Sequence, residues 1–246
     1  MQKTLGLVLK KQNIGETDRI VTIFSPSLGK KRVIARAVRK TTSKLAGHLD
    51  TFMVSQIMLT DHPDLPKVTS AQLIEPFEAI RGSLVSLEHA FAITKIIERV
   101  IVEDVSQQSI FQLTLDALSR MNDGQKWSAV WLYFLGTLTN RLGLALNDFN
   151  CLSCGQKIAG PAWWLPGERR FACRGCAAAK GEEKIPLEFN SVKLLRLLQS
   201  QPYPAVLTIN FGETIGRQVE EVLLREITEW FNKPWLSYSS LAINKS

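Results

Sequence analysis

The sequence holds few of the side chains that enzymes use for chemistry. Histidine occurs only three times, as His48, His62 and His89, and no two lie at a metal-ligand spacing. Neither a G-x-S-x-G nor a G-x-x-x-x-G-K-[ST] sequence is present, so a serine nucleophile and a phosphate-binding loop have no support. These absences favour a protein that acts by binding rather than by catalysis.

Long apolar runs are also missing. The apolar stretches are interrupted well before the roughly 20 residues that a membrane-spanning helix needs. The first residues contain only a short apolar stretch, with no small-residue cleavage site of a secretory signal after it. We therefore expect a soluble protein of a reducing compartment, without a membrane partner. Its 246 residues suffice for two or three small domains.

No cysteine stands alone, because all four fall in two C-x-x-C pairs. Cys151 and Cys154 form the first pair, Cys173 and Cys176 the second, and 18 residues separate them. This spacing is typical of a four-thiolate site for one Zn²⁺, whose closed tetrahedral shell leaves no position for substrate. The predicted zinc is therefore structural. Two disulfides or a redox C-x-x-C are the alternatives, but the first needs an oxidising compartment and the second is normally single.

Positive charge is concentrated near the N-terminus. The chain carries a net charge of +7, and residues 1–50 alone hold eleven Lys or Arg against three acids. Between Leu28 and His48 there is no acid at all. A solvated edge strand would also be basic, but exposed surfaces usually mix signs. We predict phosphate contacts of a nucleic acid along this run. The predicted contacts are Lys30, Lys31, Arg32, Arg36, Arg39, Lys40 and Lys44.

The aromatic and acidic residues near these two features are expected to be structural. Phe24 and Phe52 fall in apolar strand patterns, so binding would rely on phosphates, with little base preference and strong salt dependence. Asp18 is expected to form salt bridges with nearby bases rather than to hold a metal. Trp163 and Trp164 are expected to cover the cysteine module, with a second nucleic-acid or protein contact as the alternative.

The first 75 residues show the pattern of short strands. Five of them at regular spacing predict a small barrel, with an OB-fold as the natural candidate and an SH3-like barrel as the rival. The expected strands are residues 5–9, 18–24, 31–38, 52–59 and 67–74.

After Pro76 the apolar spacing becomes helical. Helices are expected at residues 83–103, 110–121, 127–142, 190–198 and 219–231. The predicted class is α+β, an N-terminal five-stranded OB-fold followed by an all-α region that carries a four-cysteine, zinc-ribbon-like insertion. The expected domains are 1–78 (OB-fold, DNA-binding), 79–146 with 182–246 (helical), and 147–181 (zinc module).

Several short motifs in the barrel region resemble one bacterial family. They comprise Gly-Glu-Thr-Asp-Arg-Ile-Val at 15–21, Ala-Arg-Ala-Val-Arg-Lys at 35–40 and Ser-Lys-Leu-Ala-Gly at 43–47. Their order, followed by a helical body and two cysteine pairs, is similar to the recombination mediator family RecO. The resemblance covers most of the chain and is thin after about residue 185.

The resemblance implies a cytoplasmic, nucleoid-associated DNA-repair mediator rather than an enzyme. Such proteins bind single- and double-stranded DNA, anneal complementary strands and, with RecR, help to load RecA onto strands coated by the single-strand-binding protein SSB. The family also implies that the acidic C-terminal tail of SSB docks on the helical body. Candidate basic groups there are Lys95, Arg99, Arg120 and Arg141. The alternative is a zinc-ribbon and OB protein that binds RNA in the translation or transcription machinery.

Overall fold

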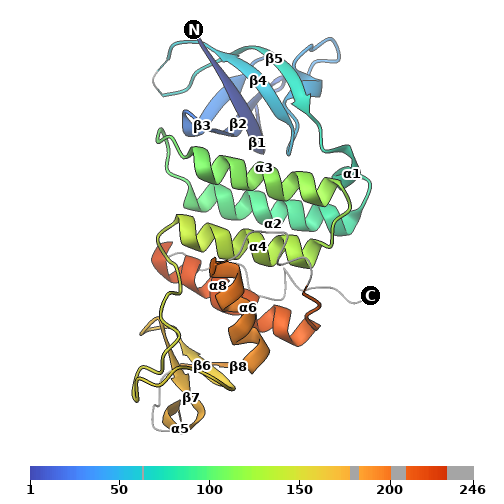
Figure 1. Ribbon diagram of the computed structural model, residues 1–246. Helices are drawn as coiled ribbons and strands as arrows, with labels where there is room; N and C mark the ends of the chain where they lie inside the picture. Colours follow the sequence, from blue (N-terminus) through green and yellow to red (C-terminus); the bar gives the residue numbers. More distant parts are fainter. Residues whose placement is uncertain (63, 178–182, 201–208, 232–246) are drawn as a thin grey trace. The chain divides into compact units, whose positions relative to one another are not determined.

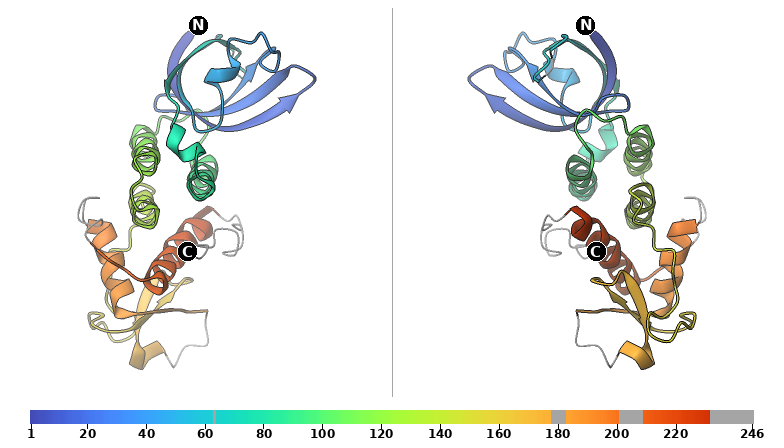
Figure 2. Two further views of the ribbon diagram at one scale, coloured as in Figure 1. Left: turned by 90° about the vertical axis from the view of Figure 1, so that its right-hand side faces the viewer. Right: turned by 90° about the vertical axis from the view of Figure 1, so that its left-hand side faces the viewer.

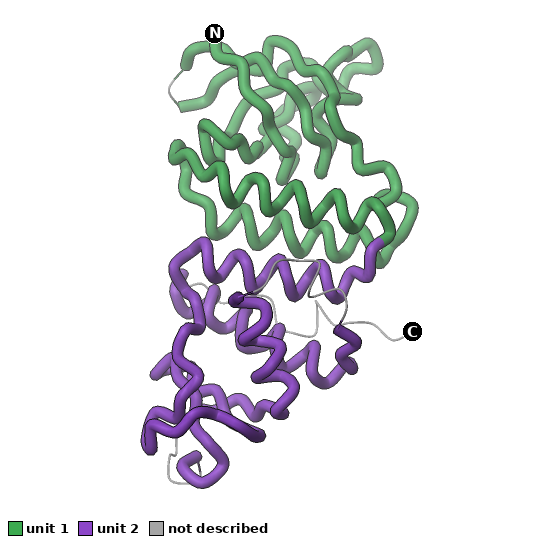
Figure 3. Tube along the Cα trace, viewed as in Figure 1, with its two compact units in different colours: residues 1–124 green, residues 125–246 purple. Residues whose placement is uncertain are grey.

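The chain forms two compact units. A computed structural model describes residues 1–62, 64–177, 183–200 and 209–231. Unit 1 covers residues 1–124 and unit 2 residues 125–246, as Figure 3 shows in two colours. In the described part of the chain, no helix combines the length and the apolar character that crossing a membrane requires.

Unit 1 begins with a five-stranded antiparallel sheet in the order β3-β2-β1-β4-β5. The sheet curls on itself, as the side views in Figure 2 show. Its two edges meet where the Ile34 N–H donates to the carbonyl of Pro66 at 2.9 Å, beside a parallel bridge from Ile34 to Lys67. This is the OB-like barrel that the sequence predicts. The strands are β1 (Gln2–Ile14), β2 (Asp18–Ser25), β3 (Gly29–Ala35), β4 (Val54–Leu59) and β5 (Val68–Glu75).

The barrel strands differ in burial because their two faces have different neighbours. In β2 both faces are buried from Ile20 to Ser25, since one side fills the barrel and the other meets a helix. The Phe24 ring lies edge-on to that of Phe111 in α3, with centroids 5.2 Å apart. The strand β5 has only Val68 fully buried, as expected of a strand with one solvated face.

Three helices complete unit 1 (Figure 1). The helices are α1 (Glu78–Arg81), α2 (Leu84–Val100) and α3 (Gln108–Asn122), and a short 3-10 turn, η1 (Ala46–His48), precedes β4. Ser83 caps α2, because its side chain accepts a hydrogen bond from the Ser86 N–H. The buried face of α2 includes Ala90, Ile93 and Ile97, whereas Leu84 is 80% exposed.

The start of β3 is joined to the segment between α2 and α3. Gly29 has φ +64°, and a Cβ at this position would lie 2.2 Å from the carbonyl oxygen of Val105. Only glycine permits both this conformation and this approach. The Lys30 N–H donates to the Val102 carbonyl at 3.3 Å, and the Asp104 N–H donates to the Lys30 carbonyl, also at 3.3 Å. The barrel and the helices of unit 1 therefore share backbone hydrogen bonds.

In the described part of unit 2, three helices pack on one another. They are α4 (Trp127–Arg141), α6 (Phe189–Ser200) and α8 (Glu213–Phe231). The helix α4 is buried on most of its faces, which explains its nearly continuous apolar sequence. Gly136 lets α6 come close, since a Cβ there would lie 2.8 Å from the Cβ of Leu198. The Trp131 indole donates to the buried Glu220 carboxylate at 2.8 Å.

Unit 2 also contains a three-stranded sheet in the order β7-β6-β8. Its strands are β6 (Ala162–Leu165), β7 (Arg170–Cys173) and β8 (Ile185–Leu187), and the four-residue helix α5 (Arg174–Ala177) follows β7. The compact units divide the chain at residue 124, so α1 to α3 belong with the barrel. The predicted boundaries at 78, 146 and 181 are positioned differently and stay a sequence-based expectation.

Candidate nucleic-acid interface and metal centre

A basic segment begins within β3, continues beyond the end of this strand and lies on the surface of unit 1. We define the basic loop as residues 32–44, from the last exposed base of β3 to the start of the turn before η1. Its five bases all have exposed side chains, and no acid interrupts them. This arrangement is suited to phosphate oxygens, which are met by mobile cations on exposed segments. The five are Arg32, Arg36, Arg39, Lys40 and Lys44.

Asp18, at the start of β2, holds the basic loop in place. Its Oδ1 accepts hydrogen bonds from the Ala37 N–H at 2.7 Å and from the Thr17 hydroxyl at 3.0 Å. Ala37 has φ +51°, which is unusual for a residue with a side chain. The Ala37 N–H is the main cause of the lowered pKa of Asp18, and the charges of Arg36 and Lys40 lower this pKa further.

The loop is also attached to the hairpin between β1 and β2. The Arg39 N–H donates to the Thr17 carbonyl at 2.9 Å, and its guanidinium donates to the Gly15 carbonyl at 3.2 Å. Asp18 therefore bonds mainly to the loop backbone, where the sequence led us to expect salt bridges. The position of Asp18 at the start of a strand did not indicate that its carboxylate would bind the backbone of the basic loop.

Lys30 and Lys31 differ from the other five predicted contacts in the groups that surround their side chains. The Lys30 ammonium donates to the Glu98 carbonyl at 2.9 Å and lies 3.9 Å from the Glu103 carboxylate. The Lys31 ammonium lies 2.6 Å from the Asp104 carboxylate. Both side chains are mostly buried, and their acidic partners, Glu103 and Asp104, lie in the segment after α2. Within unit 1 these two lysines strengthen the junction between barrel and helices.

The four cysteines come together in unit 2. Their Sγ atoms all lie within 4.8 Å of one another, and those of Cys154 and Cys173 are 3.9 Å apart. Four sulfurs at about 2.3 Å from one zinc ion would be about 3.8 Å apart, so the cluster has the dimensions of a tetrahedral site. None of the four forms a disulfide. The donor set and geometry therefore fit a metal ion of the zinc class.

Two tight turns bring the cysteine pairs to this point. In the first, the Gly155 N–H donates to the Cys151 carbonyl at 2.9 Å, and Gly155 adopts φ +72°. The second pair straddles the end of β7 and the helix α5. The Leu152 N–H donates to the Phe171 carbonyl at 2.8 Å and ties the first turn to β7. The strand β7 therefore connects both turns and holds the two cysteine pairs close together.

The electrostatics of the cluster favour a bound cation. Burial opposes ionisation of the Cys151 thiol, but backbone N–H groups of Cys173, Cys154 and Ser153 bring its pKa down to about 6. The side chains of Cys173, Cys151 and Cys154 raise the pKa of Cys176 to about 12. The thiols therefore resist joint ionisation, because each thiolate repels the next, and a central cation would remove this obstacle.

The aromatic and basic residues of the cysteine module have structural partners. Trp164 is fully buried and its ring lies 4.7 Å from that of Phe171, while Trp163 packs against the small core of Leu165, Ala172 and Ala177. These contacts support the interpretation that the tryptophans cover the module. The two arginines of the β6–β7 turn reach acids. Arg169 contacts the buried Glu226 at 2.7 Å, and Arg170 contacts Asp148 at 2.7 Å.

Other predicted residues are dispersed. Phe24 and Phe52 are buried, as predicted. Of the four bases considered for an acidic tail, Arg120 contacts Asp116 at 2.8 Å within α3. The remaining three lie on two different units, with Lys95 and Arg99 on α2 and Arg141 at the end of α4.

An OB-like barrel with an exposed basic segment is typical of the class of nucleic-acid-binding proteins, and the four-cysteine cluster is compatible with a metal site. Comparison with known proteins gives the family. Residues 1–77 match the sequence model of the recombination protein O N-terminal region, and residues 81–234 match that of its C-terminal region. The chain therefore belongs to the RecO family, as the barrel motifs suggested.

Named relatives match over most of their length. A DNA repair protein RecO of Dehalococcoides mccartyi is 30% identical over 219 residues, which cover 89% of this chain and 86% of the relative. Its counterpart in a Roseiflexus species is 29% identical over 92% of this chain and 81% of the relative. The protein of the same name in Acetivibrio thermocellus is 27% identical over 94% of this chain and 92% of the relative.

Proposed function

We propose that this protein is a DNA-repair and recombination mediator that binds single- and double-stranded DNA and anneals complementary strands without breaking covalent bonds. The observation that carries the proposal is the basic loop, five exposed bases without an acid on an OB-like barrel. The relatives that match about nine-tenths of the chain are named as DNA repair proteins, which favours DNA over RNA as the partner.

The proposed mechanism is electrostatic. Two complementary strands repel each other through their phosphates, and cations on the loop would screen both backbones as the strands approach. The proposed contacts are the five exposed bases of the basic loop. Lys30 and Lys31 would act through the junction with α2 and α3, since their ammonium groups already face backbone and carboxylate oxygens.

We further propose that one Zn²⁺ occupies the four-cysteine cluster with a structural role. Cys151, Cys154, Cys173 and Cys176 would hold the ion and fix the β6–β7–β8 sheet. A shell of four thiolates provides no open position for a substrate, so no chemical step is assigned to the metal. The partners expected on family grounds are RecR, the tail of SSB and, indirectly, RecA.

A strand-annealing assay tests the proposal. Complementary oligonucleotides, one of them labelled, are coated with SSB and mixed with the purified protein in the presence and absence of RecR. Faster duplex formation than without the protein is expected. No gain, combined with tight binding of structured RNA, would instead favour the RNA-binding alternative.

A further inference from the structure

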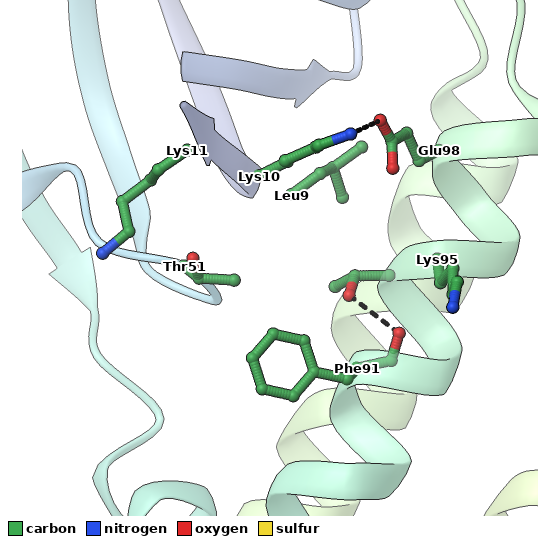
Figure 4. A pocket seen from close by; sticks show the side chains of 8 residues that line it. Leu9, Lys10, Lys11, Thr51, Phe91, Lys95 and Glu98 are labelled. Atoms are coloured by element: carbon green, nitrogen blue, oxygen red, sulfur yellow. Dashed lines mark hydrogen bonds and ion pairs between the residues drawn. The ribbon is translucent and has the colours of Figure 1, made fainter. Parts of the chain in front are cut away.

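A groove in unit 1 is lined by residues of β1 and α2. Its volume is about 450 Å³. Its lining combines apolar side chains with three lysines, two threonines and one glutamate (Figure 4). The main lining residues are Leu9, Lys10, Lys11, Phe91, Lys95 and Glu98.

A β-bulge shapes the wall of this groove. The pairing of β1 with β2 shifts register between Val8 and Lys10, so Leu9 is the extra residue. In a regular strand successive side chains point to opposite faces, yet Leu9, Lys10 and Lys11 all line the groove. Bulges commonly re-aim side chains in this way beside binding sites. The bulge therefore places Lys10 and Lys11 beside one cleft. The Lys10 ammonium lies at Glu98 (Figure 4), whereas the Lys11 ammonium forms an ion pair with the Asp50 carboxylate.

Phe91 supplies an exposed aromatic surface in the groove. Phe91 is 52% exposed, whereas the apolar residues that follow it in α2, from Ala92 to Val100, are buried. The Phe52 ring packs edge-on against the Phe91 ring, with centroids 4.7 Å apart and an interplanar angle of 67°. Phe52 itself has φ +69°, a strained conformation for a bulky residue. Such strain is typical of functional sites. Here the strained residue, Phe52, packs against the exposed Phe91 ring of the groove.

The strand β1 links the groove to the basic loop. The strand β1 runs from Lys10 at the groove to Ile14 at the hairpin, a distance of about 14 Å at the usual rise of a strand. Directly beyond Ile14, the Gly15 carbonyl accepts a hydrogen bond from Arg39 of the basic loop. The exposed half of β1 thus connects the two basic surfaces within unit 1.

From these features we infer that the groove binds one unstacked base of a single DNA strand, which stacks on Phe91 while neighbouring phosphates contact Lys10 and Lys95. This inference rests on the proposed DNA binding and extends it from phosphates to a base. A ring flanked by cations on a backbone path is the usual means of holding single strands, and it accepts any base because every base has a flat face.

Glu98 gives the groove one opposing charge. Its carboxylate lies 3.4 Å from the Lys10 ammonium, and the Lys10 side chain is 59% exposed. An exposed pair of this kind is weak, so a phosphate can replace the carboxylate at Lys10. Removal of the Glu98 charge should consequently raise the affinity for single-stranded DNA, whereas loss of the Phe91 ring should lower it.

The test compares binding of a labelled oligo-dT strand with binding of a duplex of equal length. Phe91→Leu keeps an apolar side chain but removes the ring, so single-strand affinity should fall at least about fivefold while duplex affinity stays the same. Phe91→Tyr retains the ring and should bind as wild type does. Glu98→Gln should raise single-strand affinity. In an oligo-dT strand that contains 5-iododeoxyuridine, ultraviolet light should cross-link the modified base to Phe91, as peptide mass spectrometry can detect.

Each other outcome has a definite meaning. If Phe91→Leu binds both forms of DNA as wild type does, or if the cross-link maps elsewhere, the base site is overturned while the basic loop remains. An acidic peptide that binds wild type but not Phe91→Leu, without any effect on oligo-dT, would assign the groove to a protein partner instead. A wild-type protein that binds neither form of DNA overturns the proposed function as well. Unfolding curves of the variants exclude a general loss of fold.

Discussion

The carboxylate of Asp18 accepts a hydrogen bond of 2.7 Å from the backbone N–H of Ala37, nineteen positions further along the chain. This bond fixes the start of β2 to the basic loop just after Arg36. A negatively charged residue at the base of a DNA-binding loop would weaken binding if charge alone mattered. Its effect on DNA binding therefore separates a positioning role from a purely electrostatic one.

Asp18→Ala should weaken DNA binding, even though it makes the protein more positive, because the loop loses its anchor at Ala37. Asp18→Asn keeps a carbonyl oxygen for the Ala37 N–H and should bind DNA at least as tightly as wild type. Fluorescence anisotropy with a labelled oligonucleotide measures both, and hydrogen exchange of residues 36–44 reports the order of the loop. Tighter binding by both variants would show that only the charge matters.

Replacing Arg36, Arg39 and Lys40 together with alanine should reduce both DNA affinity and its dependence on salt. Each phosphate contact contributes about 0.9 to the slope of log K against log salt on duplex DNA, so a decrease of about 2 to 3 is expected. The measurement is a series of binding curves at increasing salt.

A matched control for this variant removes three exposed bases of unit 2. Lys157, Lys193 and Arg217 are all exposed, so their replacement with alanine changes the net charge by the same amount. This variant should keep most of the affinity and the slope. Equal slopes for the two triple variants would remove the basic loop from the interface.

Metal analysis of the purified protein should find one zinc per chain. Removal of the metal by a chelator, or the exchange Cys154→Ser, should expose the segment around the β6–β7–β8 sheet to proteases, because this module has only a small apolar core. Unit 1 should keep its protease resistance and its circular dichroism. A preparation without metal but with a protease-resistant module would contradict the structural role of zinc.

Gly29→Ala should destabilise unit 1 strongly. The added Cβ would lie 2.2 Å from the Val105 carbonyl oxygen at a φ of +64°, so both strain and a backbone clash result. We expect a decrease of about 3 kcal/mol or more in the free energy of unfolding, measured with urea. Gly124→Ala is the matched control, since Gly124 also has a positive φ but open space around its Cα. It should cost only about 1 kcal/mol.

Glu220→Gln should stabilise the protein near neutral pH. Burial is the main cause that raises the pKa of Glu220 to about 6, against which the Trp131 hydrogen bond acts only partly. An acid with a raised pKa favours the folded state below its unfolded pKa, and this contribution is lost as pH rises through about 6. The variant should therefore gain about 2 kcal/mol relative to wild type at pH 7, and little at pH 4.5. Urea unfolding at several pH values measures the difference, and an equal gain at both pH values would contradict this explanation.

Much of the fold could be predicted because local patterns determine it. The apolar run after Asp18 predicted the strand β2, and the long apolar segment after Trp127 predicted the helix α4. Both elements end within one residue of the expected bounds. The spacing of the two cysteine pairs predicted a cluster that the structure forms. The helix α8 begins at Glu213, six residues before the expected start, because its first turns are mostly polar and exposed.

The functional surfaces were less predictable because they depend on distant partners. Lys31 belongs to a basic run in the sequence, yet its neighbour in space is Asp104, 73 positions away. Phe91 fits the apolar period of its helix, a pattern typical of a buried face, but it lines the groove beside the bulge and is exposed. No local pattern distinguishes a core phenylalanine from one at a cleft, or a free lysine from a paired one.

The hydrogen bonds between the start of β3 and the segment after α2 set a limit on how the protein can be divided. A fragment cut at residue 77, where the family's N-terminal region ends, would lose Val102 and Asp104 as backbone partners of Lys30. It would also expose Phe24 and the edge of β3, which are features that promote aggregation. The shortest piece suited to separate expression is therefore residues 1–124, not the isolated barrel.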